Sequence, residues 1–245
     1  EPGMVPVSLG TSGTVYAFSA EPVVDPEGEV AAFCDSTDRW LPLVCTMNVT
    51  VATEQVRKMF NWSHEELEKH VTDTPPGAGG LFFLPYLNGE RTPNLPLGKG
   101  VLYGMTTETM SPSYIARAVM EGATLGLAYG LNRIRQLGIQ PVEIRLTGGG
   151  SKSAAWRQVC ADIFGVPTVC LQSAEGAALG AALQAAYACG AAEGKPTRYR
   201  DLAPKYVKLD ESTRCKPNEA AREIYARQLA QQSDLTKRLH SAGYL

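Results

Sequence analysis

A short glycine-flanked segment near the beginning of the chain is the first place where phosphate chemistry can be sought. Gly10, Thr11, Ser12 and Gly13 stand between two apolar runs, residues 5–9 and 15–18. The glycines let a backbone approach an anion closely, and the two hydroxyls add donors to the N–H groups of a turn. The same residues also suit an ordinary tight hairpin turn, which needs no ligand. By itself the segment leaves both interpretations open.

A second glycine-rich segment, Gly148-Gly149-Gly150, follows an apolar run at 142–146 and precedes a helical pattern that starts at Ser153. A strand that leads into a helix N-terminus presents free N–H groups and the positive end of the helix dipole, where a phosphate or a nucleotide can lie. The spacing matches neither a Walker A motif nor a G-x-G-x-x-G fingerprint, so Lys152 is not taken for a P-loop lysine. The alternative is a plain glycine turn with Ser151 or Ser153 as the helix cap.

The first fifth of the chain is rich in strands that could position the first segment. Residues 5–9, 14–18, 30–34 and Trp40–Thr46 alternate or are apolar and are separated by turns with Pro and Gly, which predicts an antiparallel meander. Helical spacing follows at 49–60 and 63–70, where Ser63 and Glu66 have the spacing of a capping box. Residues 72–100 carry too many Pro and Gly for a helix and predict a long ordered excursion, after which 101–105 is a short strand.

The second half of the chain alternates helices and strands, which is typical of an α/β domain built on a central sheet. The pattern predicts helices at 112–137, from Ser153 onward and at 174–189, and strands at 142–146 and 166–171. A last helix starts after Pro217 with Asn218 as its cap. Gly122, Gly126 and Gly130 recur every fourth residue of the first of these helices, although each costs it about 1 kcal/mol against alanine. The spacing favours a smooth helix face against which another element packs closely.

Composition excludes several classes of protein. The 245 residues carry a formal net charge of −2 with scattered Lys and Arg, which disfavours a nucleic-acid partner. No apolar run is long enough to span a bilayer and no signal peptide is recognisable, so we expect no membrane partner and a cytoplasmic location. The six cysteines contain no C-x-x-C pair and are expected to be mostly buried, reduced thiols. The histidines, His64, His70 and His240, are expected at the surface, and no metal-ligating residue is assigned.

Taken together, three segments resemble the carboxy-terminal domain of the FGGY carbohydrate kinases. They are Gly10-Thr-Ser-Gly13, Leu146-Thr-Gly-Gly-Gly-Ser-Lys-Ser-Ala-Ala-Trp-Arg-Gln158 and Glu175-Gly-Ala-Ala-Leu-Gly-Ala-Ala182. Within that family, Leu84-Pro-Tyr-Leu-Asn-Gly-Glu-Arg-Thr-Pro93 is similar to the segment typical of xylulokinases. The resemblance runs from the first residues to about Leu202 and implies an actin-like ATPase fold of the ribonuclease H-like type, with ATP and Mg²⁺ as cofactors.

The resemblance also implies a set of nucleotide-binding residues. The hairpin Gly10, Thr11, Ser12 and Gly13 would meet the terminal phosphates. The backbone of Gly148, Gly149 and Gly150 would carry the adenosine and the inner phosphate, with Ser153 facing the nucleotide. Thr50 and Glu54 match positions that line the nucleotide pocket in some relatives. The segment before them, 47–50, is less rich in small residues than its counterpart in the family.

The same resemblance places the first phosphate loop, most sugar contacts and the catalytic aspartate in an amino-terminal domain. None of them matches this chain, so residues 1–245 are expected to be the nucleotide-binding half of a sugar kinase and to be inactive alone. Glu1-Pro2-Gly3 lies directly before a strand without an initial Met, which favours a preceding domain. D-xylulose is the expected substrate; ribulose, glycerol or gluconate, or a non-catalytic nucleotide-binding module, are the alternatives, and a homodimer is implied only by resemblance.

Glu90 and Arg91 are neighbours in the Pro-rich excursion and allow two interpretations. They could position the closing domains or the sugar end of a cleft. Alternatively, an internal ion pair pins the excursion. We favour this second interpretation, because adjacent residues in an extended segment point to opposite faces and need not share a functional site.

Overall fold

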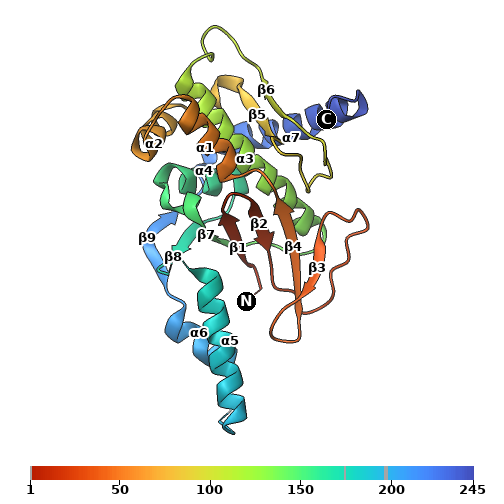
Figure 1. Ribbon diagram of the computed structural model, residues 1–245, viewed down its shortest axis with the longest axis vertical. Coiled ribbons are helices and arrows are strands. Elements are labelled where there is room, and N and C mark those ends of the chain that lie inside the picture. The colour runs from red at the N-terminus through yellow and green to blue at the C-terminus, as the bar shows by residue number, and fades with distance from the viewer. Residues whose placement is uncertain (1, 174, 196–197) are drawn as a thin grey trace.

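The computed structural model describes residues 2–173, 175–195 and 198–245 and is built on a seven-stranded sheet with the order β3-β4-β2-β1-β7-β8-β9 (Figure 1). The strands are β1 (Met4–Leu9), β2 (Gly13–Tyr16), β3 (Ala31–Cys34), β4 (Trp40–Thr46), β7 (Glu143–Thr147), β8 (Thr168–Leu171) and β9 (Leu209–Cys215). Strands β1, β7 and β8 are parallel neighbours, and the outer pairings are antiparallel. The parallel centre comes from the α/β rhythm of the second half of the chain.

The amino-terminal strands pair antiparallel, as expected, but not in the order of a simple meander. Strand β4 pairs with β2 and leaves β3 at the edge of the sheet. All four residues of β3 are exposed, whereas β1, β2 and β4 alternate between buried and half-buried positions. The alternating strands therefore occupy the interior of the sheet, and the exposed strand takes its edge.

One face of the sheet is covered by the long helix α3 (Pro112–Gln136) together with α4 (Ala154–Phe164), with α1 (Thr50–Met59) and α2 (His64–Asp73) packed beyond them (Figure 1). Ser63 caps α2 by accepting from the Glu66 N–H, and the Glu66 carboxylate accepts from the Ser63 N–H, so the expected capping box is confirmed. The Trp156 indole N–H donates to Thr124 Oγ1 at 2.9 Å and joins α4 to α3 inside the core.

Two of the three glycines of α3 make the close contacts that their spacing predicts. A Cβ at Gly122 would lie 2.3 Å from the Phe83 carbonyl oxygen, and one at Gly130 would lie 2.4 Å from Val44 Cγ1. At Gly126 the nearest neighbour would be Pro85 Cγ at 3.7 Å, an ordinary contact. Helix α3 therefore lies against strand backbone at one glycine and against a strand side chain at another.

The Pro-rich excursion pairs with the short strand expected at 101–105 in a small second sheet, whose other strand the sequence pattern does not predict. This sheet pairs β5 (Phe82–Pro85) with β6 (Gly100–Tyr103) after the short 3-10 turn η1 (Ala78–Gly80). The last helix, α7 (Glu219–Ser241), is capped by Asn218 as expected and packs on β5 and α3. All four residues of β5 are buried because α3 and α7 cover them.

A buried polar cluster fixes α7 and the excursion to α3. Glu121 accepts from Arg117 Nε at 2.5 Å, Tyr225 Oη at 2.7 Å and the Gly77 N–H at 3.0 Å. Burial raises the pKa of the Glu121 carboxyl, while Arg117 acts in the opposite direction. This carboxylate therefore has structural partners on three elements.

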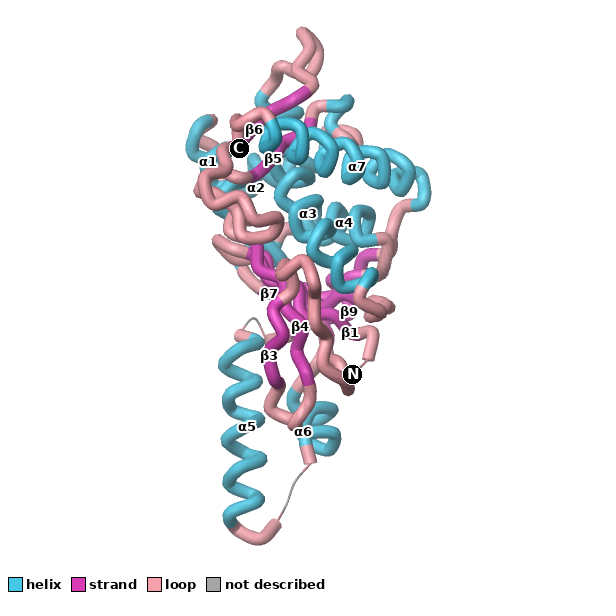
Figure 2. Tube along the Cα trace, turned by 90° about the vertical axis from the view of Figure 1, so that its right-hand side faces the viewer, coloured by secondary structure: helices cyan, strands magenta, loops and turns pink. Residues whose placement is uncertain are grey.

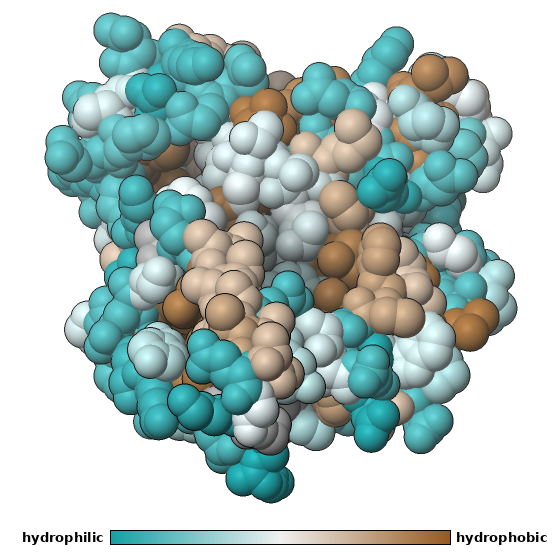
Figure 3. Space-filling model, turned by 60° about the horizontal axis from the view of Figure 1, so that its bottom comes forward, coloured by the Kyte–Doolittle hydropathy of each residue, from teal (hydrophilic) through white to brown (hydrophobic). Residues whose placement is uncertain are grey.

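Helix α5 (Gly176–Ala192) projects from the lower end of the molecule, with α6 (Tyr199–Tyr206) beside it (Figures 1 and 2). It has no buried residue, although most of its residues are Ala, Gly or Leu. Tyr187 of α5 stacks on Tyr199 of α6 with ring centroids 4.5 Å apart. Apolar patches also lie on this side of the surface (Figure 3). The predicted start of α5, residue 174, lies outside the described residues.

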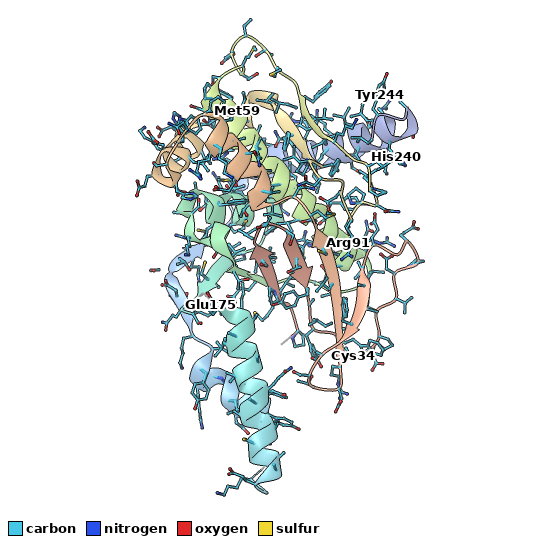
Figure 4. The ribbon with its side chains drawn as sticks, in the orientation of Figure 1. Cys34, Met59, Arg91, Glu175, His240 and Tyr244 are labelled. Carbon is cyan, nitrogen blue, oxygen red and sulfur yellow. The ribbon has the colours of Figure 1, made fainter. Side chains whose placement is uncertain are left out.

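Several expectations for individual elements and residues need correction. Helix α6 and strand β9 were not predicted, because α6 has only eight residues and contains Pro204, and β9 consists mostly of polar residues. The cysteines are all free, but only Cys160 and Cys170 are buried. Cys189 is exposed, and so is Cys34 (Figure 4). His70 is half-buried rather than exposed, since it stacks on Trp62 and its Nδ1 lies 2.8 Å from Ser113 Oγ.

Candidate functional site

The two glycine-rich segments lie side by side because the strands before them are parallel neighbours. Ser8 of β1 pairs with Thr147 of β7, and both strands then end at the same edge of the sheet. A Cβ at Gly148 would lie 2.7 Å from both the carbonyl carbon and the oxygen of Leu9, and one at Gly150 would lie 2.9 Å from Leu9 Cβ. Only glycine allows this approach, which brings two segments that are far apart in the sequence into direct contact.

The backbone of the hairpin turns its donors away from the body of the protein. The Gly10 carbonyl accepts from the Thr50 N–H at 2.9 Å, and the Thr11 carbonyl accepts from the Val49 N–H at 3.1 Å. In a trans peptide the C=O and N–H point in opposite directions, so the N–H groups of Thr11 and Ser12 point away from α1. Successive N–H groups of this kind form an anion-binding concavity.

The hydroxyls of the hairpin add to those donors. Thr11 and Ser12 are exposed, and the part of the chain that the structure describes gives neither hydroxyl a hydrogen-bond partner. Gly13, in contrast, is buried, and a Cβ there would lie 2.6 Å from Val49 Cγ2 and 2.7 Å from Leu127 Cδ2. The hairpin is thus anchored at Gly13 and open at Thr11 and Ser12.

Thr50 and Glu54 lie on the first two turns of α1, and Thr50 contacts the hairpin. The Thr50 N–H is used by Gly10, so this residue contributes to the site by supporting the hairpin. Glu54 is bound by Arg57, whose Nη2 lies 2.9 Å from Oε2, and His64 Nδ1 lies 3.6 Å from Oε1. The hydrogen bonds from Arg57 lower the pKa of the Glu54 carboxyl. Glu54 is therefore an ionised, partly exposed carboxylate whose partners belong to α1 and to the start of α2.

The second segment forms a tight turn that leads into α4. Gly148 has a φ of 84°, which favours glycine, and the 3-10 turn η2 (Gly149–Lys152) follows it. A Cβ at Gly149 would meet no atom within 4 Å, so its backbone is open to a neighbouring molecule. Ser153 caps α4 by accepting from the Trp156 N–H at 3.0 Å, which is one of the two caps that the plain-turn interpretation allowed.

Sequence reasoning missed Glu68, a half-buried residue of α2 that reaches the same turn. Its Oε2 accepts from the Ser153 hydroxyl, and its Oε1 accepts from the Ala155 N–H at 2.7 Å. Both partners lie at least 85 residues after Glu68 in the sequence. No local signal in α2 distinguishes Glu68 from its neighbouring glutamates. Only the packing of α2 against α4 reveals it.

The favoured ion pair between Glu90 and Arg91 is wrong. Glu90 is buried and accepts from the Met47 N–H at 2.7 Å and from Asn48 Nδ2 at 3.1 Å, while Arg91 is exposed (Figure 4). Among the described residues no ion pair joins Glu90 to Arg91, because the Glu90 carboxylate is buried with partners of its own while Arg91 is exposed to solvent. Burial raises the pKa of the Glu90 carboxyl. Glu90 does pin the excursion, but onto the β4–α1 connection.

The residues described show no candidate site built around a metal ion. Within 2–173, 175–195 and 198–245, no group of three or more His, Cys, Asp or Glu side chains is placed to hold a metal. What this edge of the sheet offers is a set of backbone and hydroxyl donors, which suits the phosphates of a nucleotide better than a bare cation.

Comparison with known proteins decides the family. The description "FGGY family of carbohydrate kinases, C-terminal domain" matches residues 5–189, which include both glycine-rich segments. The chain belongs to this family. Carbohydrate kinases of this family use ATP, usually together with a divalent metal ion.

Individual relatives of this FGGY domain are xylulose kinases. The chain is 42% identical to the xylulose kinase of Haemophilus influenzae over 216 residues, which cover 88% of this chain and 43% of that protein. It is 35% identical to the crystal structure of xylulose kinase from Bifidobacterium adolescentis, with a TM-score of 0.78, covering 93% of this chain and 44% of that one. A ligand-bound xylulose kinase from Lactobacillus acidophilus, 24% identical, has the same fold with a TM-score of 0.88 over 97% of this chain and 48% of that one.

These comparisons confirm the resemblance and the actin-like fold expected from the motifs. They also show that the chain spans less than half the length of the xylulose kinases it matches. No helix among the described residues is both long and apolar enough to cross a membrane.

Proposed function

We propose that this chain is the nucleotide-binding half of an ATP-dependent sugar kinase that phosphorylates D-xylulose to D-xylulose 5-phosphate. The observation that carries the proposal is the contact between the Gly10–Gly13 hairpin and Gly148. It brings a turn suited to phosphates and a turn suited to the nucleoside together at one edge of the sheet. The identity to xylulose kinases across most of the chain supports xylulose as the sugar.

In this proposal, ATP lies across the edge of the sheet. The outward N–H groups and hydroxyls of Thr11 and Ser12 hold the terminal phosphates, and the open backbone of Gly149 carries the nucleoside end. Donors fixed in this way stabilise the charge on the transferring phosphoryl group without rearrangement during the reaction. Thr50 supports the hairpin, and Glu54 and Ser153 stand at the margin of the nucleotide.

Mg²⁺ accompanies the nucleotide in the proposed reaction. No acidic cluster lies among the described residues, so this chain would bind the phosphates and not the ion itself. The phosphate oxygens would be the ligands of the ion. The metal supplies charge neutralisation on the phosphoryl group. The residues of this chain bind and orient the donor.

The remaining parts of the reaction are proposed to lie outside this chain. An amino-terminal domain would supply the catalytic aspartate that accepts the proton of the attacking sugar hydroxyl, together with most sugar contacts. Closure of that domain on this one would exclude water, which otherwise competes for the phosphoryl group. The xylulose kinases that match are about twice as long as this chain, which supports a partner domain of similar size. A cytoplasmic location and a homodimer belong to the same proposal.

The test measures ADP formation by the full-length protein with D-xylulose, ribulose, glycerol and gluconate as separate substrates. We expect activity with D-xylulose to exceed that with each of the others at least tenfold. The present chain alone is expected to bind ADP and to form none from any sugar. Sugar-dependent ADP formation by the isolated chain contradicts the proposal that the catalytic aspartate lies in another domain. A full-length protein that binds ADP without phosphorylating any sugar supports the non-catalytic alternative.

A further inference from the structure

Glu68 changes what the N-terminus of α4 can bind. Its carboxylate lies at the first turn of this helix, with Oε1 accepting from the Ala155 N–H at 2.7 Å. A negative side chain is stabilised by the positive end of a helix dipole, and it repels a second anion from the same place. The helix end that would suit a phosphate is therefore already taken by a group of the protein.

Glu68 also determines the role that Ser153 can play. A serine hydroxyl has one hydrogen to donate and two lone pairs that can accept. The Ser153 hydrogen is donated to Glu68 Oε2, and one lone pair accepts from the Trp156 N–H at 3.0 Å. Only one lone pair remains for a ligand, so Ser153 can accept a hydrogen bond from a ligand but cannot donate one.

These two effects select the same part of a nucleotide. Phosphate oxygens are acceptors and carry negative charge, so both the oriented hydroxyl and the carboxylate disfavour them. The hydroxyls of a ribose and the exocyclic amine of adenine are donors, and they satisfy the free lone pair. On the hairpin side, in contrast, the outward N–H groups and hydroxyls of Thr11 and Ser12 favour phosphate.

We infer that Glu68 is a positioning residue of the nucleotide site, which fixes Ser153 as a hydrogen-bond acceptor and turns the nucleoside end of the nucleotide toward α4. The inference rests on the proposed function, because it assumes that a nucleotide occupies this edge of the sheet. It assigns polarity to that site: donors at the hairpin hold phosphates, and acceptors at α4 hold the nucleoside.

The substitution Glu68→Gln tests this polarity without removing the contacts. The glutamine amide oxygen can accept from the Ala155 N–H, and its amide nitrogen can donate to Ser153 Oγ, which frees the serine hydrogen. Binding of adenosine and of inorganic pyrophosphate to the full-length protein is measured by calorimetry. We expect Glu68→Gln to weaken adenosine binding at least fivefold and to strengthen pyrophosphate binding at least threefold. A merely structural defect would weaken both.

Two further variants show whether Glu68 acts through Ser153. Ser153→Ala is expected to weaken adenosine binding by a similar factor, and adding Glu68→Gln to it is expected to cause less than a twofold further loss. The matched control is Glu65→Gln, because Glu65 is an exposed glutamate on the first turn of α2, the helix that carries Glu68. It should leave the affinities for adenosine and pyrophosphate within twofold.

The outcomes separate this inference from the proposed function. A wild-type protein that binds neither ADP nor adenosine contradicts the proposed function. A wild-type protein that binds both, while Glu68→Gln changes adenosine and pyrophosphate binding by less than twofold or in the same direction, overturns only the role of Glu68. The role of Glu68 is also overturned if adding Glu68→Gln to Ser153→Ala weakens adenosine binding further by the same factor as Glu68→Gln alone.

Discussion

Two glycine-rich regions of this molecule use the same residue type for different reasons. In α3, Gly122 and Gly130 lie in the core, where a Cβ would collide with Phe83 and Val44 of neighbouring strands. At the sheet edge, Gly148 is also pressed against backbone, but Gly149 one residue later faces open space. Gly122 and Gly130 therefore serve packing. The open space at Gly149, beside the hairpin at the end of β7, leaves room for a ligand.

The largest effect is expected for Gly122→Ala, which tests the close packing of the α3 glycines against neighbouring strands. A methyl group 2.3 Å from the Phe83 carbonyl oxygen forces α3 away from β5, and we expect a loss of stability of about 3 kcal/mol. Urea unfolding followed by circular dichroism measures it. The matched control is Gly126→Ala, whose Cβ has ordinary contact distances and which should stabilise the helix by up to about 1 kcal/mol. Equal effects at the two positions would show that spacing rather than contact governs them.

Gly148→Ala tests the close approach of the two functional segments. The residue has a φ of 84° and its Cβ would lie 2.7 Å from the Leu9 carbonyl, so alanine is strained and sterically blocked. We expect a loss of about 2 to 3 kcal/mol in unfolding experiments together with weaker ADP binding. Unchanged stability would mean that β1 and β7 can separate locally without cost.

At its carboxyl end, α3 contacts the β2–β3 connection through charge instead of close packing. The Asp25 carboxylate is buried, pairs with Arg133 and accepts the backbone N–H groups of Glu27, Glu29 and Val30. The Arg133 hydrogen bond is the main cause that lowers the pKa of Asp25 to about 2. Because the folded-state pKa lies below the unfolded value of 3.8, the carboxylate stabilises the fold above that value.

This stabilisation, about 2 kcal/mol, is therefore lost as the pH falls from 4 toward 2. We expect Asp25→Asn to be less stable than the wild type at pH 7 and to remove that part of the pH dependence. Thermal unfolding between pH 2 and 7 measures both effects. Asp38→Asn, in an exposed turn, is the control and should follow the wild-type curve.

The smallest expected change in free energy concerns Gly149, the glycine that faces open space. Gly149→Ala meets no neighbour within 4 Å and should leave the melting temperature unchanged. If the nucleoside lies against this backbone, the added methyl group will weaken ADP binding about tenfold, or roughly 1.4 kcal/mol. Calorimetric titration with ADP checks it, and an unchanged affinity would remove Gly149 from the proposed site.

Much of the fold could be predicted from local patterns. The strands near residues 5–9 and 142–146, the long helix α3, the capping box at Ser63 and the cap at Asn218 all depend on neighbouring residues and are confirmed. The glycine face of α3 was also predictable, because three costly residues at one spacing require compensation. Strand β5 was not, because the prolines and glycines around it hide a four-residue strand whose burial depends on α3 and α7.

The candidate site divides in the same way. The amino-acid sequence by itself determined the two glycine-rich turns, their place after strands and the family to which they belong, since these depend on residue types over short distances. Only the tertiary structure decided that Gly148 touches Leu9, that Glu90 binds Met47 and Asn48 instead of Arg91, and that Glu68 caps α4. Those contacts join residues about 40 to 140 positions apart, and the direction of a side chain across such a distance is fixed by packing and burial.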